Sequence, residues 1–344
     1  MTSAIRPGPR NLITDVDGIL VGNAEDRRAR SGTTVVMPET RCAGGTDVRG
    51  GGPGTLNVHA LDAASLAHEV DAVVLSGGSM YGLGAAAGVV AALGAQGRGI
   101  AFGGATIPVV PGAILFDLKN GGDKGWGDAP PYEALGRAAL AACGREFALG
   151  NAGAGFGARS GPLKGGLGSA STVTAEGWQI GALVAVNSFG SAVMPGTDRF
   201  WAWPLEMEGE FGGLGPPPAD WRGEAEMPTP PGFASGPLTN TTIAVVAVNA
   251  ALEKGAAHRL AIMAQDGLAR AIRPVHTPFD GDTVFVLGTG RVPLTGPAML
   301  ARLGHLAADA LARAVARGVH HAETLGDRPG WRAWRAAGGG QARG

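Results

Sequence analysis

The sequence predicts a compact globular protein in which strands and helices pack in close layers. Of the 344 residues, 45% are hydrophobic and the mean hydropathy is +0.11, which is enough apolar material for a sizeable core. Many of the 60 glycines occur in pairs between apolar runs. Because glycine permits tight turns and close backbone approach, this pattern predicts packed layers.

Charge and composition exclude several classes of protein. The formal net charge is −1, from 28 basic and 29 acidic residues, and no basic run predicts a nucleic-acid partner. Only Cys42 and Cys143 are present, so no disulfide framework or C-x-x-C metal pair is expected. The N-terminus lacks an apolar signal segment, and no window approaches 18 uninterrupted apolar residues. We therefore expect a cytoplasmic protein with no membrane partner.

In the first half of the chain, short strands alternate with glycine turns. Residues 107–118 are apolar but are interrupted by Pro111, which suits two short strands or an edge strand. Apolar spacing predicts helices at about 60–70, 82–93 and 132–143, and strands at 11–14, 19–21, 33–37 and 72–75.

The second half combines longer strands, longer helices and one irregular segment. Residues 204–239 are rich in proline, glycine and acidic residues, so we expect them to be the least structured part of the chain and flexible. The remaining pattern predicts paired strands at 169–174 and 180–186, strands at 242–248 and 284–287, and helices at about 251–272 and 296–324.

The junction at Thr241 suggests the main functional hypothesis. The irregular segment ends at Asn240, and a β-branched, apolar run begins at once. A threonine hydroxyl at such a junction can attack the preceding carbonyl, and water can then cut the resulting ester. The cut would free the α-amino group of Thr241, whose reference pKa of about 7.7–8.0 suits a base near neutral pH. The hypothesis is that the chain cuts itself between Asn240 and Thr241, leaving Thr241 as the nucleophile.

Two simpler interpretations of the same residues stay open. The sequence Asn-Thr-Thr is also an ordinary turn-to-strand junction. It fits the N-x-[ST] glycosylation pattern as well, a short motif that often matches by chance.

A different class of function is raised by the stretch from Gly153 to Ala158. These residues read Gly-x-Gly-x-x-Ala, formally a dinucleotide fingerprint, and predict as the alternative a non-catalytic dinucleotide-binding protein. The following residues 159–169 contain Pro162 and four glycines, so they do not predict the helix that the fingerprint needs. The alternative requires an intact chain, whereas the hydrolase hypothesis requires a cut one.

Further polar side chains stand at the ends of expected strands. Asn187 follows the strand at 180–186, and its amide could donate to a developing oxyanion or only close a turn. Asp280 and Asp282 lie at positions i and i+2 before another strand, so their carboxylates should project to the same side. An Asx turn is the simpler interpretation of these two residues.

Seven stretches follow one another in order along nearly the whole chain: ITDVDGILVGNA, LSGGSMYGLGAAAGV, IPVVPGAILFDL, NAGAGFGA with KGGLGSAS, ALVAVNSFG, NTTIAVVAVNA and HTPFDGDTVFVLGTG. Together they resemble the DmpA peptidase family of self-processing N-terminal-nucleophile hydrolases. That family includes D-aminopeptidases with esterase activity, β-peptidyl aminopeptidases and nylon-oligomer hydrolases of the NylC type.

The resemblance implies an α+β fold, a four-layer αββα sandwich formed by a single domain that is cut into two subunits. Residues 1–240 would form the α subunit and residues 241–344 the β subunit, and the subunits would stay together. The family tends towards homotetramers of such units. The resemblance implies no cofactor and no metal.

The resemblance also implies roles for individual residues. Thr241 would be the nucleophile, as in the nylon hydrolases, whereas the aminopeptidase members commonly carry serine. Asn187 would stabilise the oxyanion, and Asp280 and Asp282 would orient the nucleophile and its amino group.

Two positions depart from the nylon-hydrolase pattern. Phe116 stands where those enzymes place a tyrosine, so no phenol is available there. Their lysine after the Gly-Ala-Gly motif corresponds to Pro162 or, with an offset of two residues, to Lys164. Lys164 could assist catalysis, or it could be a surface residue.

The implied substrates are short peptides, amides of β- or D-amino acids, or ω-amino-acid oligomers such as those of 6-aminohexanoate. The threonine nucleophile favours the oligomers as an activity to test.

Overall fold

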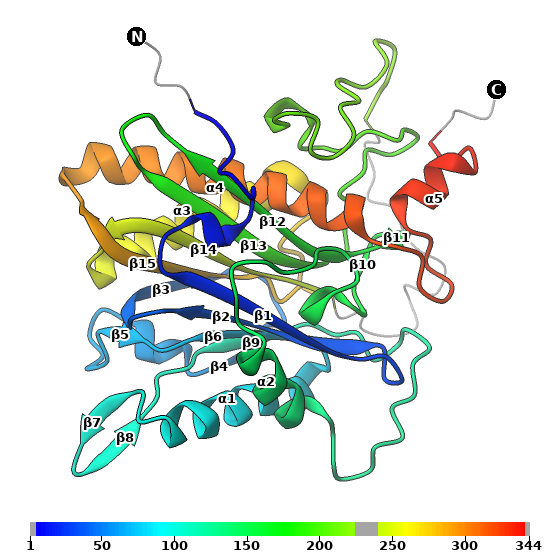
Figure 1. Cartoon of the computed structure of the whole chain (residues 1–344). Coiled ribbons are helices and arrows are strands. Elements are labelled where there is room, and N and C mark those ends of the chain that lie inside the picture. Colours follow the sequence, from blue (N-terminus) through cyan, green and yellow to red (C-terminus); the bar gives the residue numbers. More distant parts are fainter. Residues whose placement is uncertain (1–4, 224–239, 341–344) are drawn as a thin grey trace.

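The computed structural model describes residues 5–223 and 240–340, and these form four layers (Figure 1). Helices α3 (Lys254–Ala271) and α4 (Gly296–His321) cover one sheet, and helices α1 (Gly84–Ala95) and α2 (Tyr132–Ala141) cover the other. The two sheets face each other between the helix layers. The α+β, αββα sandwich expected from the family resemblance is thereby confirmed.

The larger sheet has six strands and contains the start of the apolar run at Thr241. Its central pair, β14 (Thr241–Ala251) and β15 (Thr283–Pro293), is parallel, while its other neighbours are antiparallel. The strand order is β12 (Gly166–Val173), β13 (Gln179–Asn187), β14, β15, β3 (Cys42–Val48) and β5 (Glu69–Val70).

The smaller sheet is built mainly from the first third of the chain. Its strand order is β1 (Ile19–Asp26), β2 (Ser31–Pro38), β6 (Val73–Ser76), β9 (Gly112–Ile114) and β4 (Gly54–Leu56). Two small hairpins pair β7 (Ile100–Phe102) with β8 (Ala105–Ile107) and β10 (Arg159–Ser160) with β11 (Leu163–Lys164). The short helices are η1 (Ile13–Asp15), η2 (Val58–Leu61), η3 (Ser79–Leu83), η4 (Gly153–Gly155), η5 (Trp203–Leu205) and α5 (Trp331–Ala336).

Strand β14 is buried on both faces, which explains its nearly continuous apolar sequence. Because side chains alternate along a strand, one set packs under helices α3 and α4 and the other lies between the sheets. The first set is Ala244, Val246 and Val248, and the second is Ile243, Val245 and Ala247.

Two predicted elements of the N-terminal region are wrong. Residues 11–14 are not a strand, because the Asp15 carboxylate accepts hydrogen bonds from the backbone N–H groups of Arg10 and Leu12 and closes a helical turn. Residues 60–70 are not a helix. They form the end of η2, several turns and the edge strand β5, and Leu66 remains 84% exposed.

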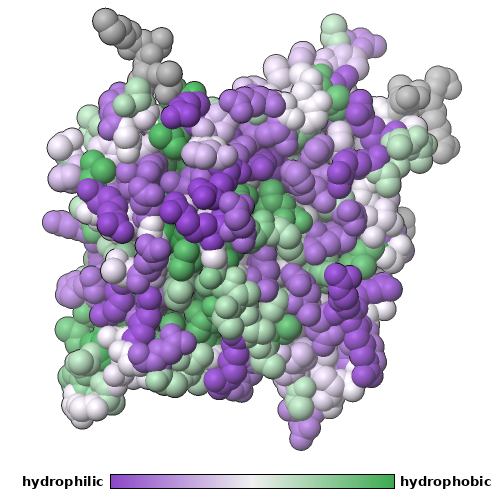
Figure 2. All heavy atoms as spheres, viewed as in Figure 1, coloured by the Kyte–Doolittle hydropathy of each residue, from purple (hydrophilic) through white to green (hydrophobic). Residues whose placement is uncertain are grey.

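The surface carries apolar side chains beside charged ones (Figure 2). Figure 2 shows them at the centre of this face and also at its lower left, where Figure 1 places the β7–β8 hairpin. Within that hairpin Phe102 is 68% exposed and Ile107 is 48% exposed. Among the described helices, none is long and apolar enough to cross a membrane.

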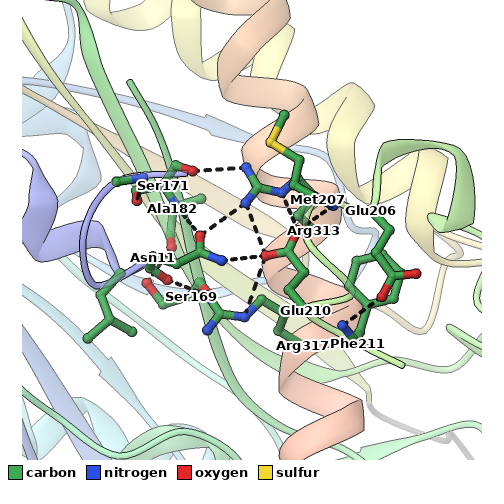
Figure 3. Close-up of polar contacts among 12 residues, drawn as sticks. Asn11, Ser169, Ser171, Ala182, Glu206, Met207, Glu210, Phe211, Arg313 and Arg317 are labelled. Carbon is green, nitrogen blue, oxygen red and sulfur yellow. Dashed lines mark hydrogen bonds and ion pairs between the residues drawn. The ribbon is translucent and has the colours of Figure 1, made fainter. Parts of the chain in front are cut away.

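The segment 204–239 is better anchored than its composition predicts, at least over the part that the structure describes. Arg313 on α4 is fully buried and donates to the Glu210 carboxylate through Nε at 2.5 Å and Nη2 at 3.0 Å. Asn11 donates to the same carboxylate at 2.6 Å, and Arg317 lies beside it (Figure 3). These contacts anchor the segment around Glu210, while residues 224–239 lie outside the described residues. The flexibility expected for the segment stays a prediction.

Replacing Arg313 by methionine should lower the free energy of unfolding by about 3–5 kcal/mol, because the buried charge of Glu210 would lose the two hydrogen bonds that Arg313 donates. Urea unfolding measures this, in a Thr241→Ala background that we expect to remain one chain. The control is Arg302→Met on the same helix, since Arg302 pairs with Glu176 near the surface and such pairs contribute about 0–1 kcal/mol. Equal losses in the two variants would contradict an anchoring role for Arg313.

Candidate active site

Thr241 and Asn187 lie opposite each other at one edge of the larger sheet. Thr241 is the first residue of β14 and Asn187 is the last residue of β13, and the antiparallel register pairs them directly. Their exposed fractions are 3% and 1%. Two residues that are 54 positions apart in sequence (241 − 187) are therefore neighbours in a buried site.

The loop before β15 reaches the same edge because β14 and β15 run parallel. Asn240 forms a parallel bridge with Asp280, and its backbone N–H donates to the Phe279 carbonyl at 2.9 Å. The Gly281 N–H in turn donates to the Asn240 carbonyl at 3.0 Å. The bond predicted to be cut is thus held against the loop that carries both aspartates.

The Thr241 hydroxyl lies against the carbonyl of the residue before it. Thr241 Oγ1 donates to the Asn240 carbonyl oxygen at 2.5 Å. This carbonyl is the one that the self-cleavage hypothesis requires the hydroxyl to attack.

Asp282 connects the start of β14 to a histidine. Its Oδ1 accepts from the Thr242 N–H at 2.8 Å, and its Oδ2 accepts from the His276 N–H at 3.1 Å. The same oxygen lies 2.8 Å from His276 Nδ1. Sequence reasoning missed His276, because only the loop conformation, with a φ of 55° at that residue, brings its ring back onto Asp282.

Asp280 mainly holds the neighbouring loops together. Its Oδ2 accepts from Thr277 Oγ1 at 2.6 Å, and its Oδ1 accepts from the Phe189 N–H at 3.2 Å. Burial, reinforced by the charge of Asp282, raises the pKa of Asp280. The two aspartates share one buried region, but only Asp282 hydrogen-bonds to the backbone of β14.

Asn187 is fixed at both ends of its side-chain amide. Its Oδ1 accepts from the Arg159 N–H at 3.1 Å, and its Nδ2 donates to the Phe116 carbonyl at 3.1 Å. Phe116 therefore contributes a backbone acceptor at the position where the family pattern has a phenol.

Arg159 is a second residue that sequence reasoning missed. Its guanidinium donates twice to the side-chain oxygen of Asn240, through Nε at 3.1 Å and Nη2 at 2.9 Å. The only sequence signal was its place beside the Gly-Ala-Gly motif, and nothing local links it to a residue 81 positions away.

Lys164 is a buried residue, so the surface interpretation is wrong. The side chain lies on β11, and its Nζ donates to the carbonyls of Gly155 at 3.0 Å and Gly165 at 2.8 Å. Burial lowers the pKa of Lys164 to about 7, although the charge of Asp117 opposes the shift.

The Gly153–Ala158 stretch does not form a dinucleotide site. Gly153–Gly155 is a single 3-10 turn, and the short strand β10 follows it in place of the helix that the fingerprint requires. The Gly155 carbonyl accepts a hydrogen bond from Lys164 Nζ, so the turn holds the side chain of this lysine. Among the described residues, no group of three or more histidine, cysteine, aspartate or glutamate side chains could hold a metal ion.

Comparison with known proteins identifies the family. A family model described as peptidase family S58 matches residues 11–332. The chain belongs to peptidase family S58. It is therefore an aminopeptidase-like hydrolase, and the resemblance to the DmpA family is confirmed.

Two relatives illustrate the range of this family. The chain is 44% identical over 341 residues to a protein named uncharacterized aminopeptidase Rv1333 from Mycobacterium tuberculosis (strain H37Rv), covering 94% of this chain and 97% of that protein. It is 28% identical over 297 residues to a 6-aminohexanoate-oligomer endohydrolase from Kocuria sp. (strain KY2), covering 83% and 77%.

Two solved structures share the fold. A β-aminopeptidase from Burkholderia sp. superimposes with a TM-score of 0.70 at 23% identity, covering 97% of this chain and 96% of that one. The L-aminopeptidase D-Ala-esterase/amidase from Ochrobactrum anthropi has a TM-score of 0.67 at 22% identity, with coverages of 92% and 88%. The latter is described as a variant of the Ntn-hydrolase fold, and this S58 chain has that fold.

The stability of the folded chain should rise with pH relative to a Lys164→Met variant between pH about 7 and 10.5, the folded and unfolded pKa values of this lysine. In that window the unfolded chain binds more protons at this position than the folded chain does, so the slope reaches at most about 1.4 kcal/mol per pH unit. Urea unfolding at pH 7 and pH 9, again in the Thr241→Ala background, measures the difference.

Lys119→Met is the matched control, because Lys119 is exposed. The comparison is the difference in free energy of unfolding between the parent chain and Lys164→Met. If this difference is the same at pH 7 and pH 9, the pKa of Lys164 is not lowered in the folded chain.

Proposed function

We propose that this S58 chain matures by cutting itself between Asn240 and Thr241, and that Thr241 then hydrolyses amide bonds. The observation that carries the proposal is the 2.5 Å contact between Thr241 Oγ1 and the Asn240 carbonyl oxygen at a buried strand start. The products would be an α subunit of residues 1–240 and a β subunit of residues 241–344. Both would remain in one sandwich, since β13 and β14 pair over eight residues each, from Thr241 to Val248 on β14.

In the mature enzyme, the Thr241 hydroxyl attacks the substrate carbonyl, and its own α-amino group takes up the hydroxyl proton. Asn187 donates to the oxyanion that forms. Asp282, which already binds the N–H of Thr242, holds the new N-terminus in place together with Asp280. Water then releases the acyl group and restores the hydroxyl.

Lys164 is proposed to assist this proton transfer. A lysine whose pKa lies at about 7 is partly neutral at physiological pH, so it can accept a proton as well as donate one. Its buried position between two backbone carbonyls supports this role over that of a surface charge.

The proposed substrates are short peptides or ω-amino-acid oligomers such as those of 6-aminohexanoate. Higher identity to a relative named an aminopeptidase than to the oligomer hydrolase supports testing short peptides first. Hydrolysis of D- or β-aminoacyl amides and esters is the alternative within the same family. Parallel assays of matured protein on aminoacyl p-nitroanilides and on 6-aminohexanoate oligomers distinguish these substrates.

We also propose that the units form a homo-oligomer, and the exposed apolar residues of the β7–β8 hairpin support an interface there. Light scattering coupled to size-exclusion chromatography would determine the number of copies.

Thr241→Ala should remain a single chain on a denaturing gel and lack amidase activity, because the attacking hydroxyl is gone. Thr241→Ser should still give two bands, since a hydroxyl remains at the same atom position. Two bands from Thr241→Ala would contradict the assignment of the nucleophile.

Asn187→Ala should lower amidase kcat about 10²–10³-fold while the protein remains folded, as expected for losing one oxyanion donor. Asn249→Ala is the matched control, because Asn249 is equally buried on β14 and also makes two side-chain hydrogen bonds to backbone. A similar loss of kcat in both variants would indicate a structural role for Asn187.

A further inference from the structure

Asn240, the residue before the bond to be cut, is held at its N–H, its carbonyl and its side chain in the uncut chain. The Asn240 N–H donates to the Phe279 carbonyl, and the Asn240 carbonyl accepts from the Gly281 N–H at 3.0 Å. The Asn240 side-chain oxygen accepts two hydrogen bonds from the Arg159 guanidinium. Few rotations remain open to a residue restrained in this way.

The oxyanion donor proposed for the mature enzyme does not make these contacts. The hydrogen bonds of the Asn187 side chain run to the Arg159 N–H and the Phe116 carbonyl. In the uncut chain, the carbonyl that Thr241 must attack accepts from the backbone N–H of Gly281, besides the attacking hydroxyl itself. Self-cleavage and substrate hydrolysis thus have different hydrogen-bond donors available for the oxyanion.

Position 281 has no room for a side chain, so it requires glycine. A Cβ atom there would lie 2.8 Å from Thr241 Oγ1 and 2.8 Å from the Gly52 carbonyl oxygen. A side chain would therefore displace the hydroxyl or the loop, and the N–H would no longer meet the carbonyl in the same geometry.

We propose that the Gly281 N–H and the Arg159 guanidinium form a maturation clamp on Asn240. The Gly281 N–H stabilises the oxyanion of self-cleavage, and Arg159 is a positioning residue that acts through the Asn240 side chain. This inference rests on the proposed function, because it concerns the self-cleavage step.

The step conserves atoms and charge. Thr241 Oγ bonds to the Asn240 carbonyl carbon, and negative charge develops on the carbonyl oxygen that faces the Gly281 N–H. The carbon–nitrogen bond then breaks, and the hydroxyl proton passes to the departing nitrogen, which leaves an ester and a free amine. Water adds to the ester, giving the Asn240 carboxylate and restoring the Thr241 hydroxyl, and the proton that is released passes to the free amine, which becomes an ammonium group.

The decisive experiment replaces the amide between residues 280 and 281 by an ester, with glycolic acid incorporated at position 281 during in vitro translation. The ester removes the N–H and adds no side chain. The fraction of cut chains is followed over time on a denaturing gel. We expect self-cleavage to slow about 10²–10³-fold, as for the loss of one oxyanion donor.

An ester at position 52 is the matched control. The Gly52 N–H donates to the Asp280 carbonyl at 2.8 Å, in the same cluster of loops but away from the scissile carbonyl. Cleavage of this control should stay within a few-fold of the all-amide chain. Equal rates for the esters at 281 and 52 would overturn the role of the Gly281 N–H.

Arg159 and Asn240 are tested by a double-mutant cycle. Arg159→Met and Asn240→Ala should each slow cleavage about 10–100-fold, as expected for losing hydrogen bonds to a charged group, and Arg159→Lys should recover part of the rate. Because the two residues act through one contact, the double variant should cut no more slowly than the slower single variant. Fully additive losses of cleavage rate would overturn the positioning role of Arg159. They would mean that each substitution damages the fold independently and not through the contact between the two residues.

The unmodified chain distinguishes failure of the proposed function from failure of the clamp alone. If it does not cut itself, the proposed function fails and the clamp fails with it. If it cuts itself but the 281 ester and the Arg159→Met variant cut at the same rate as the unmodified chain, only the clamp is wrong.

Discussion

The parallel pairing of β14 and β15 is the constraint on which the site depends. Two parallel strands begin at the same edge of a sheet, so the residues that enter them must meet there. Parallel neighbours also need a crossover connection, and α3 provides it while packing on α4 and the sheet. A single topological choice therefore places Asn240, Thr241 and the Asp280–Asp282 loop in contact.

Close backbone approach also buries the residues at this edge. A Cβ atom at Gly50 would lie 2.3 Å from the Asp280 carbonyl oxygen, and one at Gly281 would touch Thr241 Oγ1. The glycine runs that suggested tight packing in the sequence thus bring loops directly against the reacting bond. Burial shifts Lys164 and Asp280 towards their neutral forms.

Sequence reasoning succeeded where one local signal determines the structure. The apolar run after Asn240 predicted β14. The ends of the expected strands marked Asn187 and the two aspartates as candidates, and it was the family resemblance that implied their action beside Thr241. Sequence reasoning failed for residues 11–14, where the Asp15 side chain competes with a strand, and for residues 60–70, where a helical spacing of apolar residues did not produce a helix. Arg159 and His276 could not be found in this way, because their partners are set by loop conformation and by contacts between distant segments.

The distance in sequence between these contacts has a consequence for the proposed maturation. The Asn240 carbonyl meets Gly281 only after β14 and β15 have paired, and Arg159 meets Asn240 only after the β10–β11 hairpin has docked beside them. An unfolded chain has none of these contacts, so its Asn240–Thr241 bond is an ordinary, stable amide. On this mechanism, self-cleavage follows completion of the sandwich, and the nucleophile gains its free amine only inside the folded site.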